Sequence, residues 1–237
     1  MSRGLDGGSD DRARIVVKVG GAVASESAAA VLELARDNEV CVVHGAGPQI
    51  TAEMERAGIP VEFVGGRRVT TAEGMEIVRA SLRAVNEELW AALGFHAVPY
   101  FGEDIGLRAT PVPELGLVGE PVVCELPRLT RALAAGRIPV IAPIASGPLN
   151  VNADDAAAVI AIGVHADRLI FLTDVEGFML DGEVVDSLDV ATAEALVAGG
   201  ELDPRILPKL GAAITAARHG VVAFIGRTEV LAEPVPA

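Results

Sequence analysis

Short runs of hydrophobic, often β-branched residues alternate along the chain with longer segments whose hydrophobic residues recur at helical spacing. Strands are expected at 15–19, 40–43, 95–101, 138–144, 168–172 and 221–225. Helices are expected at 25–36, 48–58, 70–93, 126–135, 152–164, 190–197 and 208–219. Parallel strands that are buried on both faces are almost entirely hydrophobic, as these runs are. The alternation predicts an α/β fold, a three-layer αβα open sandwich with a mostly parallel central sheet.

The chain is expected to divide into two lobes. Residues 102–121 contain four glycines and three prolines and are expected to form hairpins or loops. Residues 1–13 are expected to be a flexible tail, followed by an N-terminal lobe at 14–146 and a C-terminal lobe at 147–237.

Composition and charge narrow the class of protein. The 237 residues are 51% hydrophobic, which favours a folded core over a disordered chain, and the net charge of −14 argues against general nucleic-acid binding. Cys41 and Cys124 are expected to be buried thiols in a reducing compartment. No secretory signal or membrane-spanning run is visible, so we expect a cytoplasmic protein.

One lysine interrupts the first predicted strand close to the strand's end. Lys18 follows Ile15, Val16 and Val17, and the chain then turns at Gly20 and Gly21. Ligands of open α/β sheets collect at the carboxyl ends of the strands, and glycines let backbone N–H groups approach an anion. The pattern favours a phosphate site, although a lysine that extends to solvent from an edge strand is an alternative.

A second glycine-bearing turn follows the second predicted strand. Gly45-Ala46-Gly47 precedes Pro48, which suits the first turn of a helix. Ile50 is too bulky for the third glycine of a dinucleotide-binding fingerprint, and the chain has no P-loop motif. A helix N-terminus beside short turns still favours anions, although each turn alone is more often structural.

Polar residues before two predicted helices are further candidates. Arg67 and Arg68 would point in different directions, so that one of them could clamp a carboxylate, although a solvated pair is the ordinary alternative. Asn150 and Asn152 could offer amide groups to a ligand, and Asp154 lies at a helix start, where capping alone would explain such residues.

A lysine at the start of the last predicted helix is less easily explained by local structure. Lys209 follows Pro208, so its charge lies where the helix dipole disfavours it. A strongly negative ligand would resolve this conflict. Phosphoryl transfer requires mainly positioning and charge neutralisation, which Lys18 and Lys209 could supply with Asp154 organising them.

Six motifs in this order resemble the amino-acid kinase family, most closely those members that phosphorylate N-acetyl-L-glutamate. The resemblance rests on Lys18–Gly21, Val43–Ile50, Gly66–Thr70, Asn150–Asp154, Leu172–Gly177 and Pro208-Lys209. It implies transfer of the ATP γ-phosphoryl group, with Mg²⁺, to the γ-carboxylate of N-acetyl-L-glutamate on the route to arginine. It also implies that the N-terminal lobe binds the amino acid and forms a homodimer, while the C-terminal lobe binds ATP.

The resemblance assigns roles to individual residues. Lys18 and Lys209 would stabilise the transferring phosphoryl group, with Asp154 organising them. Substrate binding is implied for Gly45, Ala46, Arg68, Asn150 and Asn152. Nucleotide binding is implied for Gly20, Gly21, Thr173, Asp174 and Gly177, and no residue is assigned as a metal ligand.

Some positions depart from the family pattern. Ala46 stands where a third glycine is usual, and Pro204-Arg205 replaces a glycine pair before the second lysine. Arginine-inhibited hexamers of the family use an amphipathic helix before the first lysine. The segment before Lys18 lacks such a helix, so the resemblance implies a dimer without arginine feedback. Two alternatives stay open: a sibling kinase acting on another carboxylate, such as carrier-bound aminoadipate, and a catalytically silent nucleotide or amino-acid sensor.

Overall fold

The computed structural model describes residues 12–20, 27–172, 176–180, 182–200, 202–203 and 206–233. The expectations for the tail at 1–11, for Gly21 and for Pro204-Arg205 fall outside these ranges. Within them, none of the helices combines the length and the hydropathy that crossing a bilayer requires.

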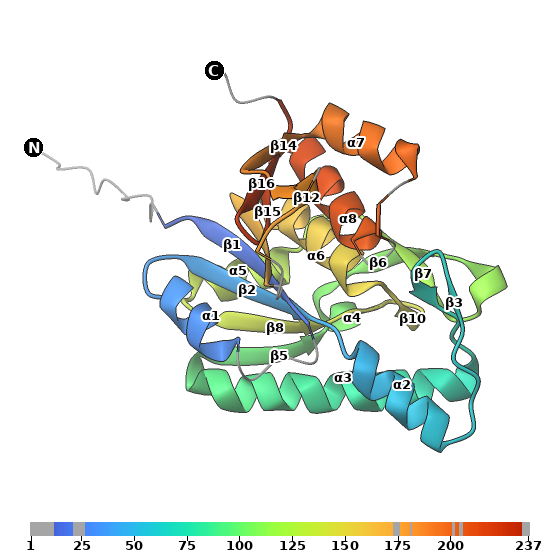
Figure 1. The fold of residues 1–237 in the computed structure, drawn as a ribbon. Coiled ribbons are helices and arrows are strands. Elements are labelled where there is room, and N and C mark those ends of the chain that lie inside the picture. Colours follow the sequence, from blue (N-terminus) through green and yellow to red (C-terminus); the bar gives the residue numbers. More distant parts are fainter. Residues whose placement is uncertain are drawn as a thin grey trace, which may run out of the picture.

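A central sheet of eight strands runs through the molecule (Figure 1). Its spatial order is β14 (Ser187–Asp189), β16 (Thr228–Leu231), β15 (Val222–Ile225), β11 (Arg168–Leu172), β1 (Arg14–Val19), β2 (Glu39–His44), β8 (Ile138–Ala142) and β5 (Ala97–Phe101). The β15–β16 pair is antiparallel and the other neighbouring strands pair in parallel. The expectation of a mostly parallel sheet is confirmed.

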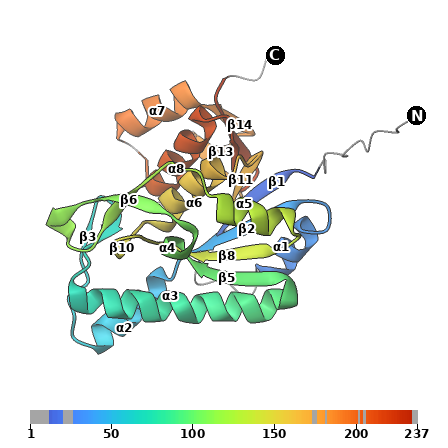
Figure 2. The same ribbon diagram turned by 180° about the vertical axis from the view of Figure 1, so that it is seen from behind.

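Helices cover both faces of this sheet, which gives the expected three layers (Figures 1 and 2). One face packs against α1 (Ala28–Leu34), α2 (Gly47–Arg56) and α3 (Ala72–Leu93). The other face packs against α5 (Pro127–Ala134), α6 (Ala153–Gly163), α7 (Val190–Gly199) and α8 (Leu207–Arg218). Successive residues of β1 alternate between the two cores: Ile15 and Val17 face the first, and Val16 faces the second.

Shorter elements extend from the layers. They are the two-residue strands β3 (Phe63–Val64), β4 (Arg67–Arg68), β9 (Ile144–Ala145), β10 (Leu149–Asn150), β12 (Met179–Leu180) and β13 (Glu183–Val184), the hairpin strands β6 (Arg108–Pro111) and β7 (Gly119–Val122), the short helix α4 (Gly102–Ile105), and 3₁₀ turns at Gly94–His96 and Pro113–Leu115. Both ribbon views place β3, β6 and β10 at the same side of the molecule.

The structure corrects some expectations. Two strands were not expected, because β16 and β14 continue the sheet beyond β15, which is the strand expected at 221–225. β14 is too short, at three residues, to show a hydrophobic period. The loop region 102–121 contains α4 as well as the expected hairpin. Both cysteines are free, but Cys124 is only half-buried.

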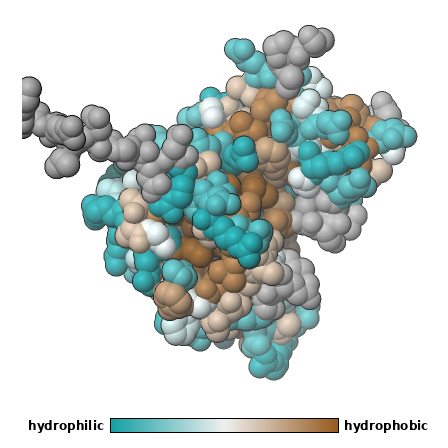
Figure 3. Space-filling model, turned by 90° about the vertical axis from the view of Figure 1, so that its left-hand side faces the viewer, coloured by the Kyte–Doolittle hydropathy of each residue, from teal (hydrophilic) through white to brown (hydrophobic). Residues whose placement is uncertain are grey.

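Most large hydrophobic side chains are inside, with a few at the surface. The space-filling view in Figure 3 shows hydrophobic residues gathered across the middle of one face, between mainly hydrophilic regions. Among the exposed large hydrophobic residues, Trp90 near the end of α3 is 48% exposed, and Phe95, just after that helix, is 78% exposed.

The loop 115–118 is fixed between two parts of the chain that are far apart in sequence. Leu115 O accepts from Thr70 N at 2.9 Å, Leu117 N donates to Thr70 O at 2.7 Å, and Leu117 O accepts from Asn150 N at 2.9 Å. Gly116 has a φ of +81°, and a Cβ there would overlap the carbonyl oxygen of Thr70. This close approach requires a glycine.

We therefore expect Gly116→Ala to lower the free energy of unfolding by about 3 kcal/mol or more, because positive-φ strain adds to the overlap. Gly220 is a matched control, since its φ is +82° and nothing lies within 4 Å of the position that its Cβ would take. Gly220→Ala should cost only about 1–2 kcal/mol. Urea denaturation measures both variants, and equal losses would show that the Thr70 contact is unimportant.

Candidate active site

The end of β1 directs Lys18 toward the layer that contains α6 and α8. Lys18 is two residues from Val16, so it shares that face of the sheet, and it lies opposite Phe171 of β11 and Val43 of β2 in the strand register. β1 has a neighbouring strand on each side, β11 and β2, so it is not an edge strand. The alternative of a lysine that extends to solvent from an edge strand is therefore wrong.

Lys18 and Lys209 converge on one carboxylate. The Nζ atoms of Lys18 and Lys209 lie 2.8 and 3.6 Å from the same oxygen, Oδ1, of Asp154. The exposed fractions of the three side chains are only 13%, 14% and 13%, in the order Lys18, Lys209 and Asp154. Two largely buried ammonium groups therefore contact the same oxygen of one carboxylate, which offsets the cost of taking their charges out of water.

The two lysines are the only lysines in the chain, and every other basic side chain apart from histidine is an arginine. Lys209 also lies with its Nζ atom 5.1 Å from the centre of the Phe171 ring. The electron-rich face of an aromatic ring attracts a cation, so Phe171 supports the position of Lys209. The sequence carries no signal for this role of Phe171, because a phenylalanine in a hydrophobic strand is explained by the core alone.

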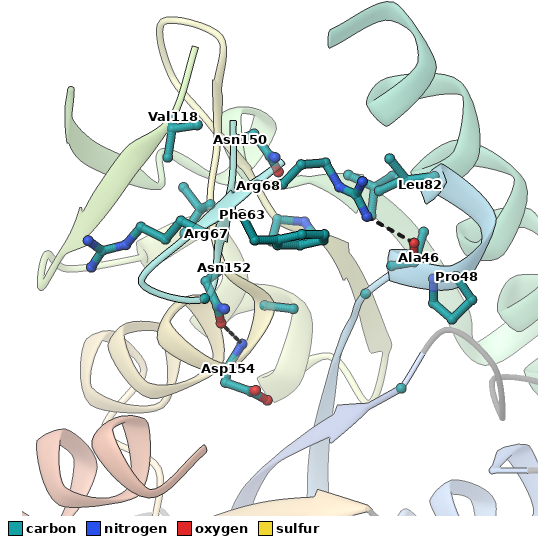
Figure 4. Close-up of a pocket in the computed structure, with 18 of the residues that line it drawn as sticks. Ala46, Pro48, Phe63, Arg67, Arg68, Leu82, Val118, Asn150, Asn152 and Asp154 are labelled. Atoms are coloured by element: carbon teal, nitrogen blue, oxygen red, sulfur yellow. Dashed lines mark hydrogen bonds between the residues drawn. The ribbon is translucent and has the colours of Figure 1, made fainter. Parts of the chain in front are cut away.

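A pocket of about 300 Å³ opens beside this cluster (Figure 4). Its lining comes from the ends of strands, the starts of helices and the β3–β4 hairpin. The lining residues are Lys18, Gly20, Gly45–Pro48, Ile50, Phe63, Gly66–Arg68, Leu82, Val118, Pro143 and Asn150–Asp154. It therefore contains all five of the substrate-binding candidates, together with Gly20 from the nucleotide set.

Three helices begin at or beside the pocket. The first residues of α2 and α6 line it, and α8 begins at Leu207, two residues before Lys209. Free backbone N–H groups and the dipole make each helix N-terminus favourable for an anion. Ala46, which precedes α2, has a φ of −141°, so its backbone does not require a glycine.

The two neighbouring arginines of β4 point in different directions, as expected (Figure 4). Arg68 is buried, and its Nη2 donates to Gly47 O at 3.1 Å and to Thr51 Oγ1 at 2.8 Å. Its guanidinium also stacks over the Phe63 ring, 4.5 Å from the centroid. Burial lowers the pKa of Arg68, and no carboxylate of the described residues forms an ion pair with it. An anionic ligand would supply the missing negative charge.

The two asparagines have structural partners as well as positions in the pocket. Asn150 Nδ2 donates to Thr70 Oγ1 at 3.0 Å. Asn152 caps α6, because its Oδ1 accepts from the N–H groups of Asp154, at 2.8 Å, and of Asp155, at 3.3 Å. The capping that the sequence predicted at Asn152 is confirmed, and it holds Asp154 in the first turn of the helix.

The nucleotide candidates are less fully described. Gly21, Thr173 and Asp174 lie outside the described residues. Gly177 is described but does not line the pocket, and a Cβ there would lie 2.5 Å from Val184 Cγ1 and 2.7 Å from Thr228 Oγ1. Close packing is therefore sufficient to explain a glycine at this position.

Two further titratable groups lie close to the site. Burial raises the pKa of Asp155 to about 6, with Asp154 and Glu120 adding to the rise and Arg67 opposing it. Burial lowers the pKa of His44, at the end of β2, to about 4, so its ring is uncharged at neutral pH. The positive charge of the site therefore comes from the lysines and arginines.

The described part of the chain contains no preformed metal site. Among the residues that the structure describes, no group of three or more histidine, cysteine, aspartate or glutamate side chains is arranged to hold a metal ion. Magnesium in kinases is held largely by substrate phosphates and water with one or two carboxylates, and such binding needs no preformed cluster.

An αβα fold with two lysines on one aspartate, beside three helix N-termini, supplies the positive charge and backbone donors that a phosphoryl-transfer enzyme needs. A sequence model of the amino acid kinase family matches residues 13–226, and the chain therefore belongs to that family. An acetylglutamate kinase of Rubrobacter xylanophilus is 41% identical over 221 residues, which cover 89% of this chain and 87% of the relative.

Solved structures have the same fold. A protein from Streptococcus mutans UA159 superposes with a TM-score of 0.81 at 26% identity, over 93% of this chain and 99% of that chain. Carbamate kinase from Giardia lamblia bound to AMP-PNP has a TM-score of 0.70 at 13% identity, over 95% of this chain and 100% of that chain. The second likeness supports the fold alone.

The pKa of Asp155 leads to a prediction about stability. The pKa of this carboxyl is about 6 in the folded protein, above the ordinary 3.8. Its ionisation therefore destabilises the fold by the full amount above pH 6, and the destabilisation decreases as the pH falls toward about 4. Asp155→Asn should therefore raise the free energy of unfolding by about 1–2 kcal/mol at pH 7.5 and by almost nothing at pH 4.

Urea denaturation at the two pH values measures this difference. Asp37→Asn, at an exposed loop position, is the control and should change stability by less than about 0.5 kcal/mol at both. Loss of stability in Asp155→Asn at pH 7.5 would mean that the ionised carboxylate is stabilising.

Proposed function

We propose that the protein transfers the γ-phosphoryl group of ATP to the γ-carboxylate of N-acetyl-L-glutamate, the reaction that begins the activation of this amino acid for arginine biosynthesis. The observation that carries the proposal is the contact of Lys18 and Lys209 with one oxygen of Asp154, at the edge of a pocket rich in backbone N–H donors. A 41% identical acetylglutamate kinase that matches 89% of the chain supports it independently.

The proposed chemistry needs no covalent enzyme intermediate. An oxygen of the substrate γ-carboxylate forms a bond to the γ-phosphorus of ATP, the bond from that phosphorus to the β-phosphate oxygen breaks, and ADP leaves. Lys18 and Lys209 neutralise charge on the phosphoryl oxygens, and Asp154 keeps the two ammonium groups in place. Mg²⁺ bound to the nucleotide phosphates would neutralise further charge.

Features of the pocket support an acyl amino acid as the acceptor. Arg68 is a buried cation without a carboxylate partner among the described side chains, so it is the proposed ligand of a substrate carboxylate. Asn150 and Asn152 are proposed to bind the amide and the second carboxylate, using the amide atoms that their structural hydrogen bonds leave free. Backbone N–H groups at Gly20 and Ala46 are proposed donors to the phosphoryl group, whereas the expected donor Gly45 N already donates to Val19 O at 3.2 Å.

We also propose which lobe binds each substrate and how the protein assembles. The amino acid would bind mainly to the lobe at 14–146, and ATP to the lobe at 147–237, where Thr173, Asp174 and Gly177 would line its site. A homodimer is supported by the edge strand β5, which among the described strands pairs with β8 alone, and by exposed alanines along α3 (Ala80, Ala84, Ala91 and Ala92). The cytoplasmic location stays a prediction.

Turnover assays test the proposal. ADP release and trapping of the acyl phosphate with hydroxylamine should occur with N-acetyl-L-glutamate and far less with glutamate, aspartate or carbamate. Turnover only with another carboxylate would favour the sibling kinase, and nucleotide binding without turnover would favour the sensor. Either result would overturn the proposed activity.

Substitution of the charged residues should separate their roles. Lys209→Ala should lower kcat by about 100-fold or more with little change in KM, because its charge acts on the transferring group. Arg68→Ala should instead raise KM for N-acetyl-L-glutamate by about tenfold or more. Arg218→Ala, at the far end of α8, is the control and should leave both constants within about twofold. Reversal of the two patterns would contradict the assigned roles.

Ala46→Gly should leave kcat/KM unchanged or higher. The negative φ of Ala46 tolerates the methyl group, and removing it can only widen the phosphoryl site. A large loss of kcat/KM with N-acetyl-L-glutamate would show instead that the methyl group packs productively against the substrate.

A further inference from the structure

Both Arg67 and Arg68 line the pocket, and Figure 4 shows the side chain of Arg67 pointing away from that of Arg68. Its Nη1 lies 2.8 Å from Oε1 of Glu120 on β7, and its Nη2 lies 4.0 Å from Oδ2 of Asp155 in the first turn of α6. One guanidinium therefore joins the β3–β4 hairpin to two other elements at the mouth of the pocket.

Each of the three joined elements supplies part of the pocket wall. The β3–β4 hairpin supplies Phe63 and Arg68, the segment leading into β7 supplies Val118, and α6 begins between Asn152 and Asp154. The turn of the hairpin also reaches the helix that carries Lys209, since a Cβ on Gly66 would lie 3.2 Å from Pro208 Cγ. A shift of this hairpin would therefore affect both the pocket proposed to bind the amino acid and the helix that carries Lys209.

The hairpin has little internal stability. Its strands are two residues long, and Phe63 and Val64 are 54% and 49% exposed. A two-stranded hairpin of this kind is at best marginally stable without contacts to the rest of the protein. Arg68 supplies one such contact to α2, through Gly47 O and Thr51 Oγ1, and Arg67 supplies another to β7.

We propose that Arg67 is a positioning residue, held by Glu120 and attracted by Asp155, that fixes the β3–β4 hairpin so that Phe63 and Arg68 face the acyl amino acid. The role of this residue in KM rests on the proposed function. The ion pair is partly exposed, since its side chains are 30% and 54% accessible. We therefore expect it to hold the hairpin in place and to contribute little to the free energy of unfolding.

Steady-state kinetics of the full chain test the proposal with Arg67→Met, which keeps most of the apolar stem, and with Glu120→Gln. Each should raise KM for N-acetyl-L-glutamate by about threefold to tenfold and leave kcat and KM for ATP within about twofold. The double variant should be no worse than the worse single variant, because both substitutions remove the same contact. Arg67→Lys should recover part of the loss.

Arg108→Met provides a control, because Arg108 is an exposed arginine on β6 of the neighbouring hairpin. It should leave KM unchanged. Unchanged KM in both single variants of an active enzyme, or losses that add in the double variant, would overturn the positioning role.

Hydrogen exchange separates this inference from the proposed function. Backbone amides of residues 60–69 should exchange at least threefold faster in Arg67→Met and Glu120→Gln than in the unsubstituted protein, while those of α3 stay unchanged. If the unsubstituted protein does not phosphorylate N-acetyl-L-glutamate, the proposed function fails, yet faster exchange would still support the fastening of the hairpin by Arg67. Unchanged exchange at 60–69 would overturn it whatever the activity.

Discussion

The organisation of the site depends on the attraction of two ammonium groups to one carboxylate oxygen. Lys18 is placed by the central strand of the sheet, Lys209 by the last long helix, and Asp154 by a helix between them in sequence. Desolvating an unpaired charge is costly, so these three elements can pack together only when the charges meet. The same arrangement brings two ammonium groups together beside the pocket, and the proposed phosphoryl group would lie against both.

The main features of the fold were predictable from the pattern of hydrophobic residues in the sequence. Six hydrophobic strand segments, with helical spacing between them, were sufficient to predict the parallel sheet and its two layers of helices, because burial on both faces constrains every position of a strand. The additional strands β14 and β16 were not predictable in this way. They are three and four residues long, and they are recognisable only from their pairing with β15 and with each other.

The candidate site was predictable where a residue conflicts with its local setting. A lysine in a hydrophobic strand and a lysine at a helix N-terminus each need a partner elsewhere in the molecule, and Asp154 is that partner. Arg67, Phe63 and Phe171 carried no such signal. An arginine or phenylalanine in a hairpin or a core strand is unremarkable until the tertiary contacts reveal what lies across from it, such as Glu120 for Arg67.

The use of arginine for every other fixed cation has a practical chemical consequence. Reagents that acylate or reductively alkylate primary amines react with ε-amino groups and with the amino terminus but not with guanidinium groups. In this chain the ε-amino targets are confined to the two groups that contact Asp154. Slow acylation of these amines, and its further slowing by a bound phosphate compound, would therefore report occupancy of the site in the unsubstituted protein.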